Sequence, residues 1–180
     1  MKNIILYIAS SLDGFIARTD GSVDWLFSDQ DYGYQEFYNS IDTVVMGRKT
    51  YEQARSFEEH PFAGKSFFVF SRSMTRSPEK NVNFIDDTIP DFIGKIKRKS
   101  RTNIWLVGGA ELIEIFLNRN SINFLILSIH PIILGKGIPL FKNLKREVNL
   151  KLRQSVSFES GLVQLHYKIL NSRQSRVTDL

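Results

Sequence analysis

Six short apolar runs, separated by segments with helical spacing, constrain the fold of this chain more than any other feature. They are NIILYIA (3–9), TVVM (43–46), SFFVF (66–70), VNFI (82–85), IWLV (104–107) and FLILSI (124–129). A strand that is apolar at nearly every position needs apolar cover on both faces of its sheet, which is typical of parallel sheets. The runs therefore predict a mainly parallel sheet between layers of helices.

Apolar residues at helical spacing lie between these runs, and alternating residues follow them. The helical sets are Tyr34, Phe37, Tyr38 and Ile41; Ile89, Phe92, Ile93 and Ile96; and Leu112, Ile113, Phe116 and Leu117. The alternating sets are Val148, Leu150 and Leu152, and Val163, Leu165, Tyr167 and Ile169. The first kind of pattern predicts helices laid on the sheet, and the second predicts a closing antiparallel hairpin.

The length and composition are those of an ordinary globular protein. A chain of 180 residues is long enough for one well-buried core. We expect a single domain over residues 1–170, because no linker rich in proline or glycine marks a boundary. The final stretch, 171–180, has little apolar surface to bury, and we expect it to fray.

The sequence also excludes several kinds of site and location. It has no cysteine and no run approaching the roughly 18 apolar residues that span a bilayer, so we expect a cytoplasmic protein with no membrane partner. The net charge of +5 suits an anionic ligand. Nucleic acid is not expected, since no aromatic residues are interleaved with the cations of residues 95–101. No metal site is expected, because His130 has no second ligand at suitable spacing.

Glycines, cations and hydroxyls follow three of the apolar runs. The segments are Gly47-Arg48-Lys49-Thr50, Ser71-Arg72-Ser73 and Gly108-Gly109-Ala110-Glu111. Since the carboxyl ends of parallel strands meet at one edge of a sheet, we expect these segments to lie together. Glycine lets backbone N–H groups approach a ligand, and guanidinium groups bind phosphate. Each segment alone is also explained by turn geometry, helix capping or surface charge, but the combination favours a phosphate-bearing ligand.

Five motifs follow one another along the chain: SLDGFIA, VVMGRKTYE, FVFSRS, IWLVGGAELIEIFL and LSIHPIILGKGIPLF. In this order they resemble the dihydrofolate reductase superfamily. The pieces SLDG and ILGKGIPLF are more similar to the riboflavin-pathway reductase, or RibD C-terminal, family. The resemblance implies an α/β fold with a mainly parallel, twisted eight-stranded sheet flanked by helices. It also implies a homodimer and an oxidoreductase that binds NADPH across the strand ends.

The resemblance assigns the cofactor to particular residues. They are Ala9, Ile16, Gly47, Arg48, Lys49, Thr50, Ser71, Arg72, Ser73, Val107, Gly108, Gly109, Ala110 and Glu111. Residues 108–111 match the pyrophosphate site, and residues 48–50 match the phosphates of the adenosine half. Ser71 and Arg72 match the contacts to the ribose 2′-phosphate. Ala9 and the loop of residues 13–17 match the segment that closes over the nicotinamide.

The substrate side departs from the riboflavin-pathway pattern. Val107 stands where those reductases have a glutamate, and the first helix has no arginine near Tyr38. Asp31, counted back from Gly47, matches the acidic residue of dihydrofolate reductases, although a helix cap explains it equally well. Asp13 is a second catalytic candidate, or a turn residue. The candidates for substrate binding are Trp25, Glu36 and Lys136.

These observations predict an NADPH-dependent reductase that transfers hydride to a pterin-like or pyrimidine-like small molecule. The first choice of substrate is 5-amino-6-(5-phosphoribosylamino)uracil, the intermediate that the resemblance implies. One alternative is a dihydrofolate reductase. The other is a non-catalytic nucleotide-binding protein of the same fold, which the missing glutamate and arginine favour.

Overall fold

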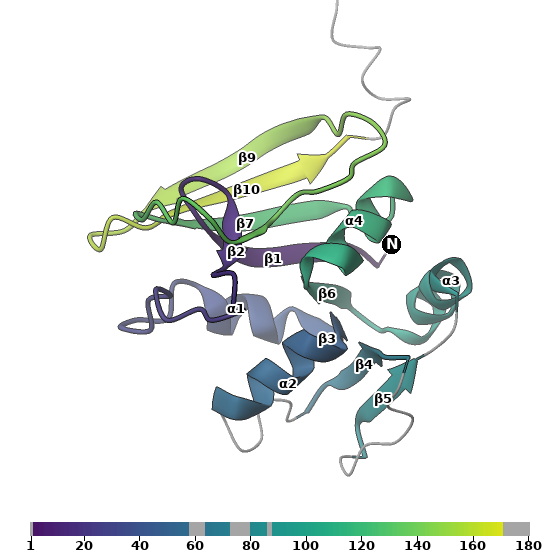
Figure 1. Cartoon of the computed structure of the whole chain (residues 1–180). Helices are drawn as coiled ribbons and strands as arrows, with labels where there is room; N and C mark the ends of the chain where they lie inside the picture. The colour runs from purple at the N-terminus through teal and green to yellow at the C-terminus, as the bar shows by residue number, and fades with distance from the viewer. Residues whose placement is uncertain (1, 58–63, 73–79, 86–87, 171–180) are drawn as a thin grey trace, which may run out of the picture.

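A computed structural model describes residues 2–57, 64–72, 80–85 and 88–170, and within them a large mixed sheet (Figure 1). Its strands are β1 (Ile4–Ser11), β3 (Ile41–Gly47), β4 (Ser66–Phe70), β5 (Val82–Ile85), β6 (Asn103–Gly108), β7 (Phe124–His130), β9 (Leu150–Ser157) and β10 (Val163–Ile169). The eight strands lie in the order β5-β4-β3-β6-β1-β7-β10-β9. All neighbours from β5 to β7 are parallel, while β10 and β9 are antiparallel. The predicted fold class is confirmed.

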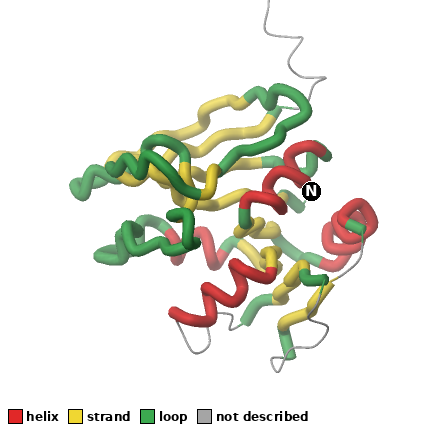
Figure 2. Tube along the Cα trace, viewed as in Figure 1, coloured by secondary structure: helices red, strands yellow, loops and turns green. Residues whose placement is uncertain are grey.

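Helices cover both faces of this sheet (Figure 2). They are α1 (Tyr34–Asn39), α2 (Arg48–Phe57), α3 (Ile89–Lys99) and α4 (Ala110–Asn118). Buried residues of α3 and α4 pack with Leu6 and Val45, whereas Phe37 of α1 and Tyr51 of α2 pack with Val44 on the other face. Neighbouring residues of one strand thus enter two different cores. This burial on both faces explains why the parallel strands are apolar at nearly every position.

The helical pattern near residue 40 extends too far in the prediction. Ile41 is the first residue of β3, and α1 ends at Asn39. Ser40 closes the helix, because its N–H donates to the carbonyl of Phe37 at 2.9 Å. Ile41 is buried in the same core as Phe37, so a single apolar surface runs across the helix-to-strand junction. The spacing therefore detected a shared core and not a continuous helix.

The closing hairpin forms as predicted, but its outer strand is not buried. Leu150 and Leu152 of β9 expose 40% and 50% of their surface. Alternation here reflects strand geometry, since β9 is the edge of the sheet and has a neighbour only at β10. The expected homodimer stays a prediction, and the expected frayed tail, 171–180, lies outside the described residues.

A small two-stranded sheet, absent from the sequence-based prediction, joins two loops beside the carboxyl ends of β1 and β7. It consists of β2 (Phe15–Ala17) and β8 (Ile138–Pro139). The N–H of Leu140 also donates to the carbonyl of Gly14 at 2.9 Å. Gly137 precedes β8 and packs so closely that a Cβ there would collide with the carbonyl oxygen of Ala17. Only glycine fits this crossing.

We expect Gly137→Ala to destabilise the protein by about 1–3 kcal/mol, because the new methyl group must push two backbone segments apart. Gly94→Ala is the matched control, since Gly94 lies inside α3 and its Cβ would meet only the flexible side chain of Arg98. Alanine there should raise stability by up to about 1 kcal/mol through its helix propensity. Chemical denaturation measures both values, and equal effects of the two substitutions would contradict the close crossing.

Candidate functional site

The three predicted phosphate-binding segments lie side by side at the carboxyl edge of the sheet. Strand β3 lies between β4 and β6, so the ends of these strands are neighbours. In the strand register Gly47 pairs with Phe70, the last residue of β4, and Met46 pairs with Gly108, the last residue of β6. The chain thus brings residues 47–50, 71–72 and 108–111 to one edge. This placement was predicted from the positions of the apolar runs alone.

Glycine is required at this edge for two separate reasons. Gly108 has φ +116°, a conformation that other residues rarely adopt, and a Cβ would also approach the Ile113 side chain to 3.1 Å. At Gly109, a Cβ would lie 3.5 Å from the hydroxyl oxygen of Thr50. The peptide bond between Gly108 and Gly109 is cis. Backbone without side chains therefore lies at the ends of β3 and β6.

Helix α4 begins directly after the two glycines. Gly109 is its N-cap residue and contributes no side chain, while its carbonyl accepts from the N–H of Ile113 at 3.1 Å. Ala110 is buried at the first turn. The Glu111 side chain is 87% exposed, with one carboxylate oxygen 4.0 Å from Nζ of Lys142. The helix amino terminus consequently offers backbone N–H groups to an anion, and the carboxylate of Glu111 is turned to solvent.

Cations follow the ends of β3 and β4, and one of them, Arg48, already has a partner. Arg48 opens α2, and its Nη1 lies 2.7 Å from a carboxylate oxygen of Glu52. Lys49 and Arg72 are exposed. An anion at Arg48 has to share the guanidinium with Glu52, so Lys49 and Arg72 are the more accessible charges. Among the other predicted residues here, Thr50 is half-buried.

The end of β4 contributes a buried hydroxyl. Ser71 is buried, and its N–H donates to the carbonyl of Ile85 at 3.1 Å, which holds the residue against the end of β5. Ser73, also predicted to bind the cofactor, lies outside the described residues. Val107 is half-buried next to the glycines and packs with the core that contains Phe37.

Asp13 lies at the ends of β1 and β7, where it connects two loops. Its carboxylate accepts from the Ser11 hydroxyl at 2.6 Å and from the N–H groups of Leu134 and Gly135 at 3.1 and 2.7 Å. The Ser11 hydrogen bond, assisted by the two backbone donors and opposed by partial desolvation, lowers the pKa of Asp13. A carboxyl group held in its charged form suits a structural clamp better than a proton donor.

Three other predicted residues surround this clamp. Ala9 lies near the end of β1 and pairs with Ser128 of β7, and Ile16 is in the middle of β2. Lys136 is exposed in the loop before β8. All three therefore lie on the β1–β7 side of the carboxyl edge.

Asp31 lies three residues before Tyr34, the first residue of α1, and its side chain caps the helix from outside the N-cap position, which Gly33 occupies. One carboxylate oxygen accepts from the N–H of Gln35 at 2.9 Å, and both Asp31 and Glu36 are exposed. Capping accounts for this position without any catalytic role, so catalysis by Asp31 stays a prediction. Trp25 is buried, and its Nε1 has no hydrogen-bond partner in the part of the chain that the structure describes.

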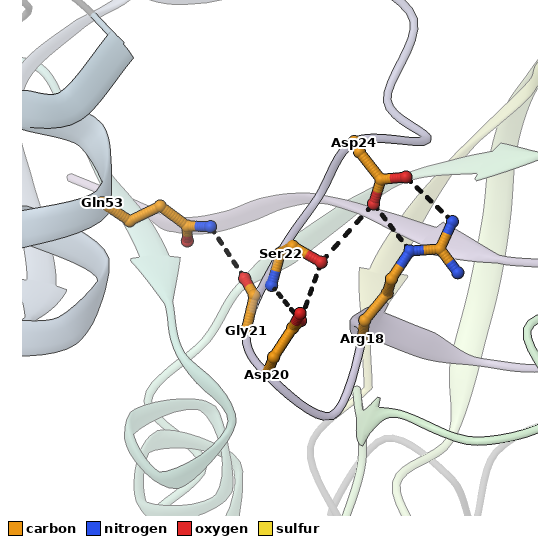
Figure 3. A network of polar contacts seen from close by, with 6 residues as sticks. All are labelled: Arg18, Asp20, Gly21, Ser22, Asp24 and Gln53. Carbon is orange, nitrogen blue, oxygen red and sulfur yellow. Dashed lines mark hydrogen bonds and ion pairs between the residues drawn. The ribbon is translucent and has the colours of Figure 1, made fainter.

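A turn of residues 18–24 connects this substrate-side region to α2 (Figure 3). Arg18 forms a two-point ion pair with Asp24, at 2.6 and 3.0 Å. Asp20 accepts from the backbone and hydroxyl of Ser22, which tightens the turn. Gln53 of α2 then donates through Nε2 to the carbonyl of Gly21 at 2.8 Å. The helix that carries Arg48 at its start is thereby bound to the segment that leads to Trp25.

The sequence-based prediction missed a buried polar cluster around Gln164. This side chain is 6% exposed and contacts Tyr7, Ser128 and His166. Gln164 and His166 occupy the polar positions of an alternating strand, so they look like solvent-facing residues in the sequence. The segment before α1 lies against Gln164, whose Nε2 donates to the carbonyl of Tyr32. Two polar residues at alternate positions of a strand that lies between two others are the available signal.

A hollow in the surface of the protein lies away from this carboxyl edge. It has a volume of about 580 Å³ and lies at the opposite, amino edge of the sheet, where Lys2, Lys97 and Arg101 line it. No described helix is long and apolar enough to cross a membrane. Within the described ranges, no three His, Cys, Asp or Glu side chains are grouped so that they could hold a metal ion.

One known protein family matches nearly the whole chain. Residues 2–164 match the RibD C-terminal domain family. The chain belongs to that family. YwjB of Bacillus subtilis (strain 168) is 40% identical over 170 residues, which are 92% of this chain and 97% of YwjB. The crystal structure of a "Putative riboflavin biosynthesis protein" from Shewanella sp. PV-4 has a TM-score of 0.84 and 30% identity, covering 94% of this chain and 99% of that one.

The wider fold family includes dihydrofolate reductases. The enzyme from Enterococcus faecalis, complexed with NADP(H) and RAB-propyl, has a TM-score of 0.70 and covers 94% of this chain and 97% of its own. At 15% identity this likeness shows the fold alone. The RibD C-terminal family and this fold are those of reductases, which supports an oxidoreductase in general.

We expect Asp13→Asn to loosen the loop of residues 134–135, because a neutral amide accepts backbone hydrogen bonds less strongly than a carboxylate. The amide hydrogens of Leu134 and Gly135 should exchange about tenfold faster, the size expected for weakening a charged hydrogen bond. Asp20→Asn is the control, since Asp20 clamps a different turn. Hydrogen exchange followed by NMR measures both, and unchanged exchange in Asp13→Asn would rule out the clamp.

The same clamp should depend on pH. Because folding lowers the pKa of Asp13, its contribution is fully present above the ordinary value of 3.8 and is lost as the pH falls through the lower folded value. The protection factors of the two amides, which correct for the intrinsic pH dependence of hydrogen exchange, should therefore fall only below about pH 4, as NMR hydrogen exchange at a series of pH values measures.

Proposed function

We propose that the protein is an NADPH-dependent reductase of a small pyrimidine-like or pterin-like heterocycle. The observation that carries this proposal is the convergence of three strand ends, at Gly47–Thr50, Ser71–Arg72 and Gly108–Ala110, on one edge of the sheet. When bound, NADPH supplies the hydride. The chain itself supplies anchoring for the cofactor, orientation of the substrate and control of protons.

The residues present fit a dinucleotide phosphate. Gly108 and Gly109 leave space that a Cβ would fill, next to the hydroxyl of Thr50 and the start of α4. Backbone N–H groups at a helix terminus bind a pyrophosphate without any cation. The buried hydroxyl of Ser71 and the exposed guanidinium of Arg72 suit a separate phosphate monoester, which NADPH has and NADH lacks.

The first candidate substrate is 5-amino-6-(5-phosphoribosylamino)uracil. Membership of the RibD C-terminal family supports this choice, and the name of the Shewanella protein points to the same pathway. Val107 and Tyr38 weaken this choice of substrate. The resemblance implies a glutamate at the position of Val107 and an arginine near that of Tyr38. Dihydrofolate is the second candidate, favoured by Asp31 at the start of α1. A non-catalytic nucleotide-binding protein is the third possibility.

Steady-state oxidation of NADPH with each compound tests the proposed function. We expect turnover with one of the two substrates at a kcat of about 1 s⁻¹ or more, within the usual range for enzymes. The matched control omits the substrate and measures the slow oxidation of NADPH by the protein alone. If the protein binds NADPH but oxidises it with neither compound, the non-catalytic alternative replaces this proposal.

Cofactor choice gives a separate prediction. NADPH should bind more tightly than NADH, and Arg72→Gln should reduce this difference by on the order of 1–3 kcal/mol, the cost of losing a charge-assisted contact to the 2′-phosphate. Lys99→Gln is the control, because Lys99 is an exposed cation at the end of α3. Calorimetric titration with both cofactors measures the effect. Equal affinity of the unmodified protein for NADPH and NADH would overturn the assignment.

A further inference from the structure

A directed chain of side chains crosses the sheet from β10 to β1. Nε2 of His166 lies 2.7 Å from Oε1 of Gln164. Nε2 of Gln164 donates to the hydroxyl oxygens of Ser128 and Tyr7 at 3.1 and 3.3 Å, and to the carbonyl of Tyr32 at 3.3 Å. These residues come from β10, β7, β1 and the segment before α1. None of the candidate residues identified from the sequence takes part in this chain.

The chemistry of the amide group sets the direction of these hydrogen bonds. An amide oxygen only accepts, so Nε2 of His166 must carry the hydrogen of its bond to Gln164. An amide nitrogen only donates, so the hydroxyl oxygen of Tyr7 acts as an acceptor. Three acceptors therefore compete for the two amide hydrogens. The Ser128 hydroxyl also hydrogen-bonds that of Tyr7. With Ser128 as the donor, the phenol oxygen accepts from both neighbours, and the Tyr7 hydrogen is left for a ligand.

Tyr7 lies on the substrate side of the carboxyl edge. It precedes Ala9 by two residues, so the two side chains point to the same face of β1. The Tyr7 ring packs edge-on against Phe37 of α1, with 4.5 Å between centroids. The ring of Tyr34, which is 40% exposed, lies 6.4 Å away. Tyr7 is half-buried, so part of its surface is exposed near α1 and the carboxyl ends of β1 and β7.

The surroundings keep this hydroxyl neutral. Burial is the main cause that raises the pKa of Tyr7, and the negative charge of Asp31 adds to it. Hydrogen bonds from Gln164 and Ser128 act in the opposite direction but are smaller in effect. A phenol whose pKa is raised retains its hydrogen at neutral pH and can donate it in a hydrogen bond.

We propose that the Tyr7 hydroxyl donates a hydrogen bond to the substrate, and that Gln164 and His166 are positioning residues that set its direction. The group it recognises is an acceptor atom, a carbonyl oxygen or an imine nitrogen, on a planar heterocycle that lies beside the Tyr34 ring. Reduction of a C=O or C=N group places negative charge on that heteroatom, which a fixed donor stabilises. This inference rests on the proposed function and specifies its substrate site.

Three variants test the direction of the bond. Tyr7→Phe removes the donor and should lower kcat/KM about tenfold or more, while the NADPH affinity changes less than about twofold. Gln164→Glu should produce the same loss, because the introduced carboxylate accepts the Tyr7 hydrogen and withdraws it from the substrate. The double variant should be no slower than Tyr7→Phe, since both changes remove one interaction. If Gln164→Glu does not fold, Gln164→Met removes the amide instead and should cause a smaller loss.

Tyr167→Phe is the matched control, since it removes a phenol hydroxyl from β10 on the other face of the sheet, where Tyr167 packs with the core that contains Leu6 and Val45. It should keep kcat/KM within about twofold of the unmodified protein. Full activity of Tyr7→Phe, or equal losses in Tyr7→Phe and Tyr167→Phe, would overturn the inference and leave the proposed function intact.

A binding experiment without cofactor separates the two proposals. The protein contains six tyrosines, which can be labelled with ¹³C at Cζ, and Tyr7→Phe identifies the Tyr7 resonance. Addition of dihydrofolate or 5-amino-6-(5-phosphoribosylamino)uracil should shift this resonance in the unmodified protein and not in Gln164→Glu. A shift without turnover would refute the reductase and support the donor site. An unmoved Tyr7 resonance with both compounds would refute the donor site, whatever the turnover.

Discussion

Parallel pairing of β4, β3, β6, β1 and β7 is the constraint on which the candidate site depends, because it puts all their carboxyl ends at one edge. Segments separated by many residues, such as Gly47–Thr50 and Gly108–Ala110, meet there without any long loop. The same pairing requires helices on both faces, since each strand buries side chains in two cores. At this edge, therefore, bare backbone and charged side chains lie together above a rigid support.

The sequence predicted the strands of this sheet well because burial on both faces leaves a continuous apolar signal. The runs at 66–70 and 82–85 coincide with β4 and β5. Prediction was wrong where one core covers two kinds of structure, as at Ile41, whose helical spacing with Phe37 hides the start of β3. The β2–β8 pair was missed because three-residue and two-residue strands are too short to show a period.

The site was predictable only where backbone chemistry dominates. Glycines before a helix can be found in the sequence, and Gly108 does need its unusual φ. Pairing of side chains that are far apart in the sequence cannot be found in this way, so the loop clamp of Asp13 emerges only in three dimensions. Gln164 was overlooked for a related reason. Its partners come from β1, β7 and residue 32, which are far away in the sequence.

The hydrogen bond from Gln53 to the carbonyl of Gly21 makes the two halves of the candidate site mechanically dependent on each other. Gln53 lies on the helix whose first residue is Arg48, and Gly21 belongs to the turn that leads to Trp25. Any ligand that shifts this helix must also move the turn or break the bond. By thermodynamic linkage, a ligand at the turn then alters affinity at the helix by the same factor as the reverse. An amide and a carbonyl can thus couple the affinities for two ligands that bind to different parts of the candidate site.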